Sequence, residues 1–342
     1  MNMNEATLSI LLLWTFVFVY LIAGSLDFGS GFWAMVYSNR KDTLAGNIAN
    51  KYLSPAWEVT NTLLVMFVVA LVSFFPKATF TFGTILLVPA NLILILLTIR
   101  TAFMVFAYSA KEYQKILNQI SGITGILIPA LLVVVLPVTH GGYVEGTGAS
   151  QQLLLGRVFT SPTVYSFIGL AILITLYLSS LLLADYAKIT GDKSAYLIYR
   201  KHAMWTGPLF FLFALFVLFA LKNEANWLYE NMIDRWLWLL LSVIAFAIGY
   251  YSMWLKDDGK EIGRPRMALI FIGLQLFIAS YTYGAAHLPY LIYPATVEES
   301  FTNINMYRSL IMSYLIGTLL FIPAFVWHWR LFIRNEKYIR GS

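Results

Sequence analysis

The sequence predicts an all-α, polytopic membrane protein, and two observations carry that prediction. Of the 342 residues, 59% are hydrophobic and 12% are charged, which is about half the charged fraction of a typical soluble domain. The apolar residues also form long blocks separated by short charged stretches, as repeated crossing of a bilayer requires. Blocks such as 63–75 do not alternate polar and apolar residues, which excludes a transmembrane β-barrel.

Nine apolar blocks predict nine transmembrane helices. The first block has no basic residue before it, so it lacks the basic start of a cleaved signal peptide and is expected to remain as a span. The first, third and ninth exceed the roughly 20 residues that a bilayer needs, so they are expected to tilt or project. The predicted helices are 8–36, 55–75, 80–108, 118–137, 162–185, 203–221, 236–255, 267–288 and 307–333.

The connections between these helices are short. Residues 1–342 are therefore expected to form a single integral membrane domain. The longest connection, 138–161, is rich in glycine and is expected to be a flexible linker rather than a phosphate-binding loop, because no Lys-Ser/Thr follows its glycines.

Basic residues predict the orientation of the helices. Of the 23 Lys and Arg residues, 17 lie in alternate connections and the C-terminal tail, 5 lie in the opposite set, and Arg100 lies inside a helix. Because cytoplasmic loops are enriched in basic residues, the N-terminus is expected outside and the C-terminus in the cytoplasm.

Composition also excludes several kinds of chemistry. The chain has no cysteine, so it can form no disulfide, thiolate zinc site, iron–sulfur cluster or catalytic thiol. The net charge of +6 reflects the cytoplasmic loops, so we expect no nucleic-acid partner.

Three charged residues fall inside the predicted helices: Asp27, Glu58 and Arg100. Each costs about 2.5–3.5 kcal/mol at the centre of a membrane helix, so each is expected to face protein. Arg100 has only apolar neighbours on its own helix and needs a partner from another helix, for which a carboxylate is the obvious candidate. Asp27 lies on a helix face of small residues, namely Ala23, Gly24, Ser30, Gly31 and Ala34.

Polar residues surround Glu58 on the second helix. Ser54, Asn61 and Thr62 share its face and are candidates to hold water, while Trp57 is expected to pack against another subunit. Asp27, Glu58 and Arg100 all lie in the predicted cytoplasmic half. Two interpretations stay open: an ion cluster that fixes helix register, or a proton or ion route from the cytoplasm.

The four histidines do not form the pattern of a diheme cytochrome. His140 and His287 are predicted at the outer edge of the membrane, and His202 and His328 at the inner edge. Bis-axial haem ligation needs two pairs that face each other within the helices, so we expect this chain to bind no haem and no metal. No catalytic triad or metal-binding spacing is present, and we assign no catalytic residue.

Several short motifs nevertheless resemble one family. The stretch Leu26-Asp27-Phe28-Gly29-Ser30-Gly31, then Ser54-Pro55-Ala56-Trp57-Glu58, Ile99-Arg100, and His287-Leu288-Pro289-Tyr290-Leu291-Ile292-Tyr293-Pro294 resemble subunit II of the cytochrome bd quinol oxidases. The similarity covers nearly the whole chain in length, helix number and motif order.

This resemblance implies a function and a set of partners. It implies two four-helix bundles plus one extra helix, paired in a bacterial cell membrane with a subunit I that carries two b-type haems, one d-type haem and the quinol-oxidising loop. Quinol and oxygen would be the substrates of the complex, and a small accessory subunit can join it. Some relatives hold a structural quinone in this subunit. Asp27 and Glu58 match acidic residues implicated in proton delivery in that family.

Two other classes of function compete with a non-haem oxidase subunit. A proton-coupled secondary transporter would also explain intramembrane carboxylates and proline kinks, although no inverted repeat is visible in the sequence. A purely structural or assembly protein would not need Asp27 and Glu58.

Overall fold

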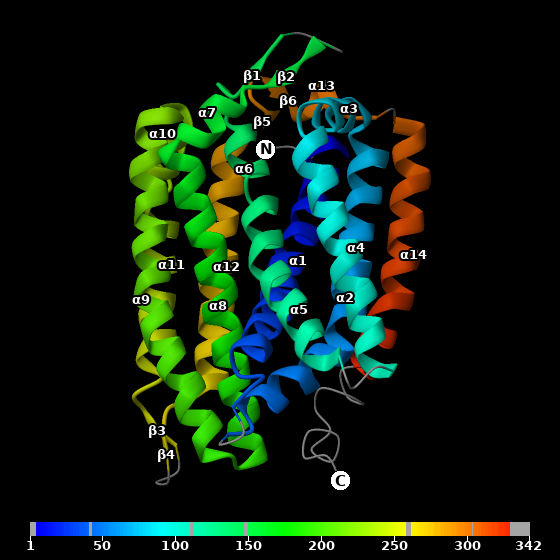
Figure 1. Ribbon diagram of the computed structural model, residues 1–342. Helices are drawn as coiled ribbons and strands as arrows, with labels where there is room; N and C mark the ends of the chain where they lie inside the picture. Colours follow the sequence, from blue (N-terminus) through cyan, green and yellow to red (C-terminus); the bar gives the residue numbers. More distant parts are fainter. Residues whose placement is uncertain are drawn as a thin grey trace.

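The computed structural model describes residues 5–40, 43–109, 113–146, 150–257, 261–302 and 304–328. Long helices lie side by side, and short helices and hairpins gather at their ends (Figure 1). The helices are α1 (Glu5–Val36), α2 (Ala45–Phe74), α3 (Pro76–Ile85), α4 (Leu87–Ser109), α5 (Gln114–Leu132), α6 (Val135–Thr139), α7 (Leu155–Thr160), α8 (Pro162–Thr190), α9 (Lys193–Glu224), α10 (Asn226–Ile233), α11 (Trp236–Tyr251), α12 (Pro265–His287), α13 (Val297–Ser300) and α14 (Ile304–His328).

Six two- or three-residue strands form antiparallel hairpins that connect the helices. They are β1 (Val144–Glu145) with β2 (Gln152–Leu153), β3 (Lys256–Asp257) with β4 (Glu261–Ile262), and β5 (Tyr290–Ile292) with β6 (Ala295–Thr296). The prediction of an all-α, polytopic membrane protein is confirmed. Within the described residues, eight helices are long and apolar enough to cross a membrane, and the pair α10–α11, bent by 75°, brings the number to nine.

Two predicted helices are interrupted by turns. The predicted helix 80–108 breaks at Leu86 into α3 and α4, and its span begins only at Leu87. The predicted helix 118–137 lies within one span, Lys115–Thr139, in which a turn at Val133 and Val134 separates α5 from α6. The reason is the same in both. A proline ring clashes with the carbonyl group four residues earlier, and the residues four before Pro89 and Pro137 are Ile85, the last of α3, and Val133, the first after α5.

Two helices are longer than their apolar blocks. The predictions began at residues 55 and 203, whereas α2 begins at Ala45 and α9 at Lys193. Hydrophobicity predicts only the part of a helix that lies in the membrane. Where the helix continues into solvent, its first residue is set by local features such as an N-terminal cap. Asp192 supplies such a signal for α9, because its carboxylate accepts a hydrogen bond from the amide of Ala195 at 3.0 Å.

The expectation of a flexible linker at 138–161 is also wrong for the residues described there. They contain the end of α6, the β1–β2 hairpin and α7. Tyr143 and Ser161 both donate to Glu224 Oε2 at the end of α9, at 2.8 and 2.5 Å. The glycines form turns here rather than a flexible segment. Gly141, Gly142 and Gly146 have φ of about 80–90°, a backbone conformation that glycine adopts readily.

The long helices fall into two groups (Figure 1). The helices α1, α2, α4 and α5 pack together as the first bundle, α8, α9, α11 and α12 form the second bundle, and α14 lies beside α2. The helices α1 and α5 contact α8 across the boundary. There, Trp33 Nε1 donates to Ser179 Oγ at 3.0 Å, and a Cβ on Gly29 would collide with that hydroxyl and with the carbonyl oxygen of Thr175.

Candidate functional site

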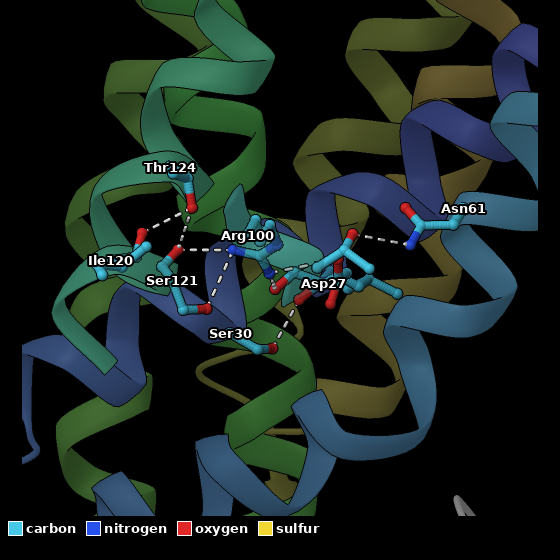
Figure 2. A network of polar contacts seen from close by, with 9 residues as sticks. Asp27, Ser30, Asn61, Arg100, Ile120, Ser121 and Thr124 are labelled. Atoms are coloured by element: carbon cyan, nitrogen blue, oxygen red, sulfur yellow. Dashed lines mark hydrogen bonds and ion pairs between the residues drawn. The ribbon is translucent and has the colours of Figure 1, made fainter. Parts of the chain in front are cut away.

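A buried ion pair lies inside the first bundle. Asp27 of α1 and Arg100 of α4 are each 2% exposed, and Arg100 Nη2 lies 3.3 Å from Asp27 Oδ2 (Figure 2). A carboxylate from another helix is therefore the partner of Arg100. In a low-dielectric interior the attraction within such a pair offsets part of the cost of burying either charge alone.

Both terminal nitrogens of the guanidinium group make further hydrogen bonds. Arg100 Nη1 donates to the carbonyl oxygen of Ser121 on α5 at 2.6 Å and contacts its hydroxyl oxygen at 3.1 Å. Nη2 donates to the backbone carbonyl oxygen of Asp27 at 3.2 Å, and the ring of Phe28 lies 5.0 Å from the guanidinium carbon. Arg100 thus joins α1, α4 and α5 at one point, as Figure 2 shows.

Two glycines make room for this arrangement. A Cβ on Gly31 would lie 2.8 Å from Ser121 Oγ and 3.1 Å from Arg100 Nη1. A Cβ on Gly125 would collide with the carbonyl oxygen of Phe28. The small-residue face predicted around Asp27 is thus the contact surface of α1 with α5 and with the arginine side chain.

One carboxylate oxygen of Asp27 stays unpaired. Its Oδ1 is buried and has no hydrogen-bond partner among the described residues. A carboxylate oxygen that is free inside a membrane protein can bind a proton or a water molecule, while Oδ2 is held by the arginine. Asp27 therefore combines a fixed position with one available proton-binding atom.

Glu58 does not join this ion pair. Its side chain is exposed on the surface of α2, as is that of Thr62, whose hydroxyl donates to the Glu58 backbone carbonyl oxygen at 2.9 Å. A neighbouring residue of α2, Asn61, contacts α4 instead. Its Nδ2 lies 3.4 Å from Oγ1 of Thr101, the residue that follows Arg100. The structure thus brings Asp27 and Arg100 together and leaves Glu58 on the bundle surface nearby.

Two other predicted supporting residues of α2 can be placed only in part. The side chain of Ser54 lies outside the described residues. Trp57 is half-buried, and its indole Nε1 has no hydrogen-bond partner within the part of the chain that the structure describes.

Sequence reasoning missed a second buried polar cluster, at the end of the molecule where α6 and α12 meet. The rings of His140 and His287 lie 5.9 Å apart. His140 Nε2 bonds the hydroxyl of Tyr283 at 2.6 Å, and His287 Nε2 bonds the hydroxyl of Thr139 at 3.1 Å. The motif that begins at His287 was visible, but nothing local in the sequence pairs it with a residue 147 positions earlier.

This cluster does not have the form of a metal or haem site. His287 Nδ1 lies 2.9 Å from the carbonyl oxygen of Tyr290, so both of its ring nitrogens are engaged. His202 Nε2 is bonded to Tyr37, and the side chain of His328 is not described. Among the described residues, no three His, Asp or Glu side chains gather as a metal site would require.

Comparisons with known proteins identify relatives of this chain. The family model of cytochrome bd terminal oxidase subunit II matches residues 5–332. A curated protein of Bacillus subtilis (strain 168), described as a cytochrome bd menaquinol oxidase subunit II, is 49% identical over 340 residues, covering 98% of each chain.

A solved structure agrees with these sequence matches. The bd oxidase from Geobacillus thermodenitrificans contains a chain that is 35% identical, with a TM-score of 0.83, covering 97% of this chain and 100% of that one. The motifs around Asp27, Glu58, Arg100 and His287, the helix number and the near-complete coverage all agree: the chain belongs to the cytochrome bd terminal oxidase subunit II family.

Proposed function

We propose that this chain is the haem-free subunit of a quinol oxidase, and that its first bundle supplies part of the proton path used to reduce oxygen to water. The observation that carries the proposal is the buried Asp27 carboxylate, whose Oδ2 is paired with Arg100 while Oδ1 has no protein partner among the described residues. A purely structural ion pair would gain from satisfying both oxygens.

The placement of haem in the partner follows from the histidines. The family implies haem in the complex, but the described histidines here are engaged with Tyr283, Thr139, Tyr290 and Tyr37. Among the fully buried ring nitrogens of the described residues, His140 Nδ1 alone has no partner. One free nitrogen does not suit bis-axial ligation, so we assign the haems and the quinol-oxidising loop to subunit I.

Glu58 supports a contact with that subunit. Glu58 lies near the end of the span that begins at Trp57, where an exposed carboxylate costs less than at the helix centre but is still better placed against protein or water than against lipid; Thr62 is exposed beside it. We therefore assign this face of α2 to the interface with subunit I, where Glu58 would receive protons at the boundary between the subunits. The hydrogen bond from Asn61 to Thr101 links α2 to α4, the helix that carries Arg100.

The path would start from the cytoplasm. Protons taken from that side contribute to the membrane potential, each charge being worth about 2.3 kcal/mol per 100 mV. The excess of basic residues in alternate connections orients the N-terminus outward and places the residue 193 region in the cytoplasm. The alternative hypothesis, a proton-coupled secondary transporter, has no observation in its favour that an oxidase subunit does not also explain.

The orientation can be tested directly because the chain contains no cysteine. A Lys193→Cys variant should react with an impermeant thiol reagent only after the membrane is permeabilised. Labelling in intact cells would reverse the orientation and place both carboxylates on the outer side.

The proton path is tested by removing the carboxylates without changing their size. In the assembled complex, Asp27→Asn and Glu58→Gln should each slow oxygen consumption by at least about tenfold, which is roughly 1.4 kcal/mol in the limiting barrier. Haem content, read from the absorption spectrum, should be preserved.

The matched control is Asp185→Asn. Asp185 is also a carboxylate on a spanning helix, but it pairs with the exposed Arg266 between α8 and α12 at 3.0 Å. Its replacement should leave turnover unchanged. Full turnover in an assembled Asp27→Asn, Glu58→Gln double variant would show that protons arrive entirely through subunit I.

A further inference from the structure

The hydroxyl group of Tyr20 is a second unpaired polar group on the face of α1 that carries Asp27. Tyr20 precedes Asp27 by seven residues, so the two share one side of the helix. The Tyr20 hydroxyl oxygen and Asp27 Oδ1 are both buried, and neither has a hydrogen-bond partner among the described residues. Two such atoms on one helix face call for a common explanation.

The position of Gly24 shows where the tyrosine ring points. A Cβ on Gly24 would lie 3.8 Å from Tyr20 Cζ, the carbon that bears the hydroxyl, and 3.3 Å from Phe28 Cε2. Side chains in a helix usually point toward its N-terminus, whereas the tip of this ring reaches Gly24, which lies between Tyr20 and Asp27 in the helix.

Apolar side chains close off the space around this hydroxyl. Tyr20 packs against a cluster built from all four helices of the first bundle, comprising Phe28, Ile93, Leu97, Ile128, Leu64, Leu96, Leu131 and Leu132. These residues can neither donate nor accept a hydrogen bond. Leaving a buried polar atom without a partner costs about 1–3 kcal/mol, and buried water is the usual remedy in a polar site.

We propose that Tyr20 and Asp27 hold a water molecule between the tyrosine hydroxyl and Oδ1, and that Tyr20 is a positioning residue for the proton-binding oxygen of Asp27. The proposal rests on the proton path proposed above. When Oδ1 is ionised, Tyr20 donates to the water and the water donates to Oδ1. When Oδ1 carries a proton, it donates to the water, and the water donates to the tyrosine oxygen. Oδ1 therefore keeps a partner in both states, and Tyr20 retains its own proton throughout.

The test replaces only the hydroxyl group. Tyr20→Phe in the assembled complex should slow oxygen consumption by about tenfold, because the variant loses the hydrogen bond that holds the water molecule against Oδ1. Adding Tyr20→Phe to Asp27→Asn should slow turnover no further, because both changes act on the same site.

A matched control exists in the second bundle. Tyr177 of α8 is fully buried and its hydroxyl also has no partner among the described residues, so Tyr177→Phe makes the same change in a place without a carboxylate. Tyr177→Phe should retain full turnover. If both tyrosine variants lose the same activity, the effect is one of packing and the proposal is wrong.

Infrared spectroscopy measures a band of Asp27 itself, whose frequency a change in packing alone would leave unchanged. The carbonyl band of protonated Asp27, identified by its loss in Asp27→Asn, should shift in Tyr20→Phe and stay in place in Tyr177→Phe. If Tyr20→Phe does not assemble, the unaltered complex exchanged into oxygen-18 water decides the question. An isotope-sensitive water band that Asp27→Asn abolishes supports the bridge, and its absence refutes it.

These outcomes separate the two proposals. Full turnover and an unshifted band in Tyr20→Phe, with Asp27→Asn still slow, would overturn the water bridge and leave the proton path standing. Full turnover in Asp27→Asn would overturn the path, and the infrared band would then report alone on whether Tyr20 and Asp27 share a water molecule.

Discussion

The chain buries titratable groups in two places and treats them in opposite ways. Inside the first bundle, Asp27 and Arg100 lie 3.3 Å apart as a charged pair. Between α6 and α12, His140 and His287 lie side by side and bond hydroxyl groups, and no carboxylate in the described part of the chain bonds either ring. The first site is built to hold charge, and the second is built to exclude it.

The difference follows from what each side chain can do when water is removed. An arginine cannot lose its proton in a protein, so its burial demands an anion and a full set of acceptors. A histidine can become neutral. Burial, assisted by the neighbouring His287, lowers the pKa of His140 to about 3, so this ring is neutral at any physiological pH.

The largest expected effect on this difference between the two sites comes from removing the cation, Arg100. Arg100→Gln leaves the Asp27 carboxylate buried and alone, and breaking a buried pair in this way costs about 3–5 kcal/mol. We expect loss of the assembled complex, measured by its recovery after membrane extraction and by its thermal unfolding.

Arg266→Gln is the control, because that guanidinium is 67% exposed and its pair with Asp185 faces solvent. Exposed pairs contribute about 0–1 kcal/mol. An Arg100→Gln complex as stable as Arg266→Gln would mean that Asp27 is neutral and that the first bundle holds no charged pair.

A smaller effect should appear at the histidine site on acidification. The unfolded chain binds a proton at His140 below a pKa of about 6.5, whereas the folded chain does so only near 3. Between these values the unfolded state binds more protons, so stability falls as the pH falls, by up to about 1.4 kcal/mol for each pH unit. The fall is measured as the thermal unfolding midpoint from pH 7 to 5.

His140→Gln sharpens that measurement, since glutamine can still bond Tyr283 but does not titrate. The variant should lose much of the acid sensitivity while keeping the stability found at pH 7. If the unfolding midpoint of the variant falls with pH as steeply as that of the unaltered protein, groups other than His140 cause the acid sensitivity.

Much of this architecture was predictable from the sequence, and the reasons are physical. The bilayer allows few backbone solutions, so apolar block length alone predicted the spanning helices. The requirement that Arg100 find an anion followed from the cost of its charge. The breaks at Leu86 and Val133 were also readable in principle, because each lies four residues before a proline or next to that position.

Other features depend on contacts that no local pattern encodes. The sequence could not predict that Asp27 is buried and Glu58 is exposed. Both residues lie on helix faces of small or polar residues, and such faces look alike in sequence. The partner of His140 comes from a helix 143 residues away. The structure of the segment before α8 depends on Glu224, the last residue of α9, which accepts hydrogen bonds from Tyr143 and Ser161.

The close approach at Gly29 has a mechanical consequence. Where a Cβ would collide with the backbone and a side chain of α8, α1 and α8 are already at the limit of helix contact, and the bond from Trp33 to Ser179 crosses the same boundary. Alternating access works by rocking one half of a protein against the other. Rocking here would separate this close contact between the two bundles, so the bundles are expected to stay rigid relative to each other.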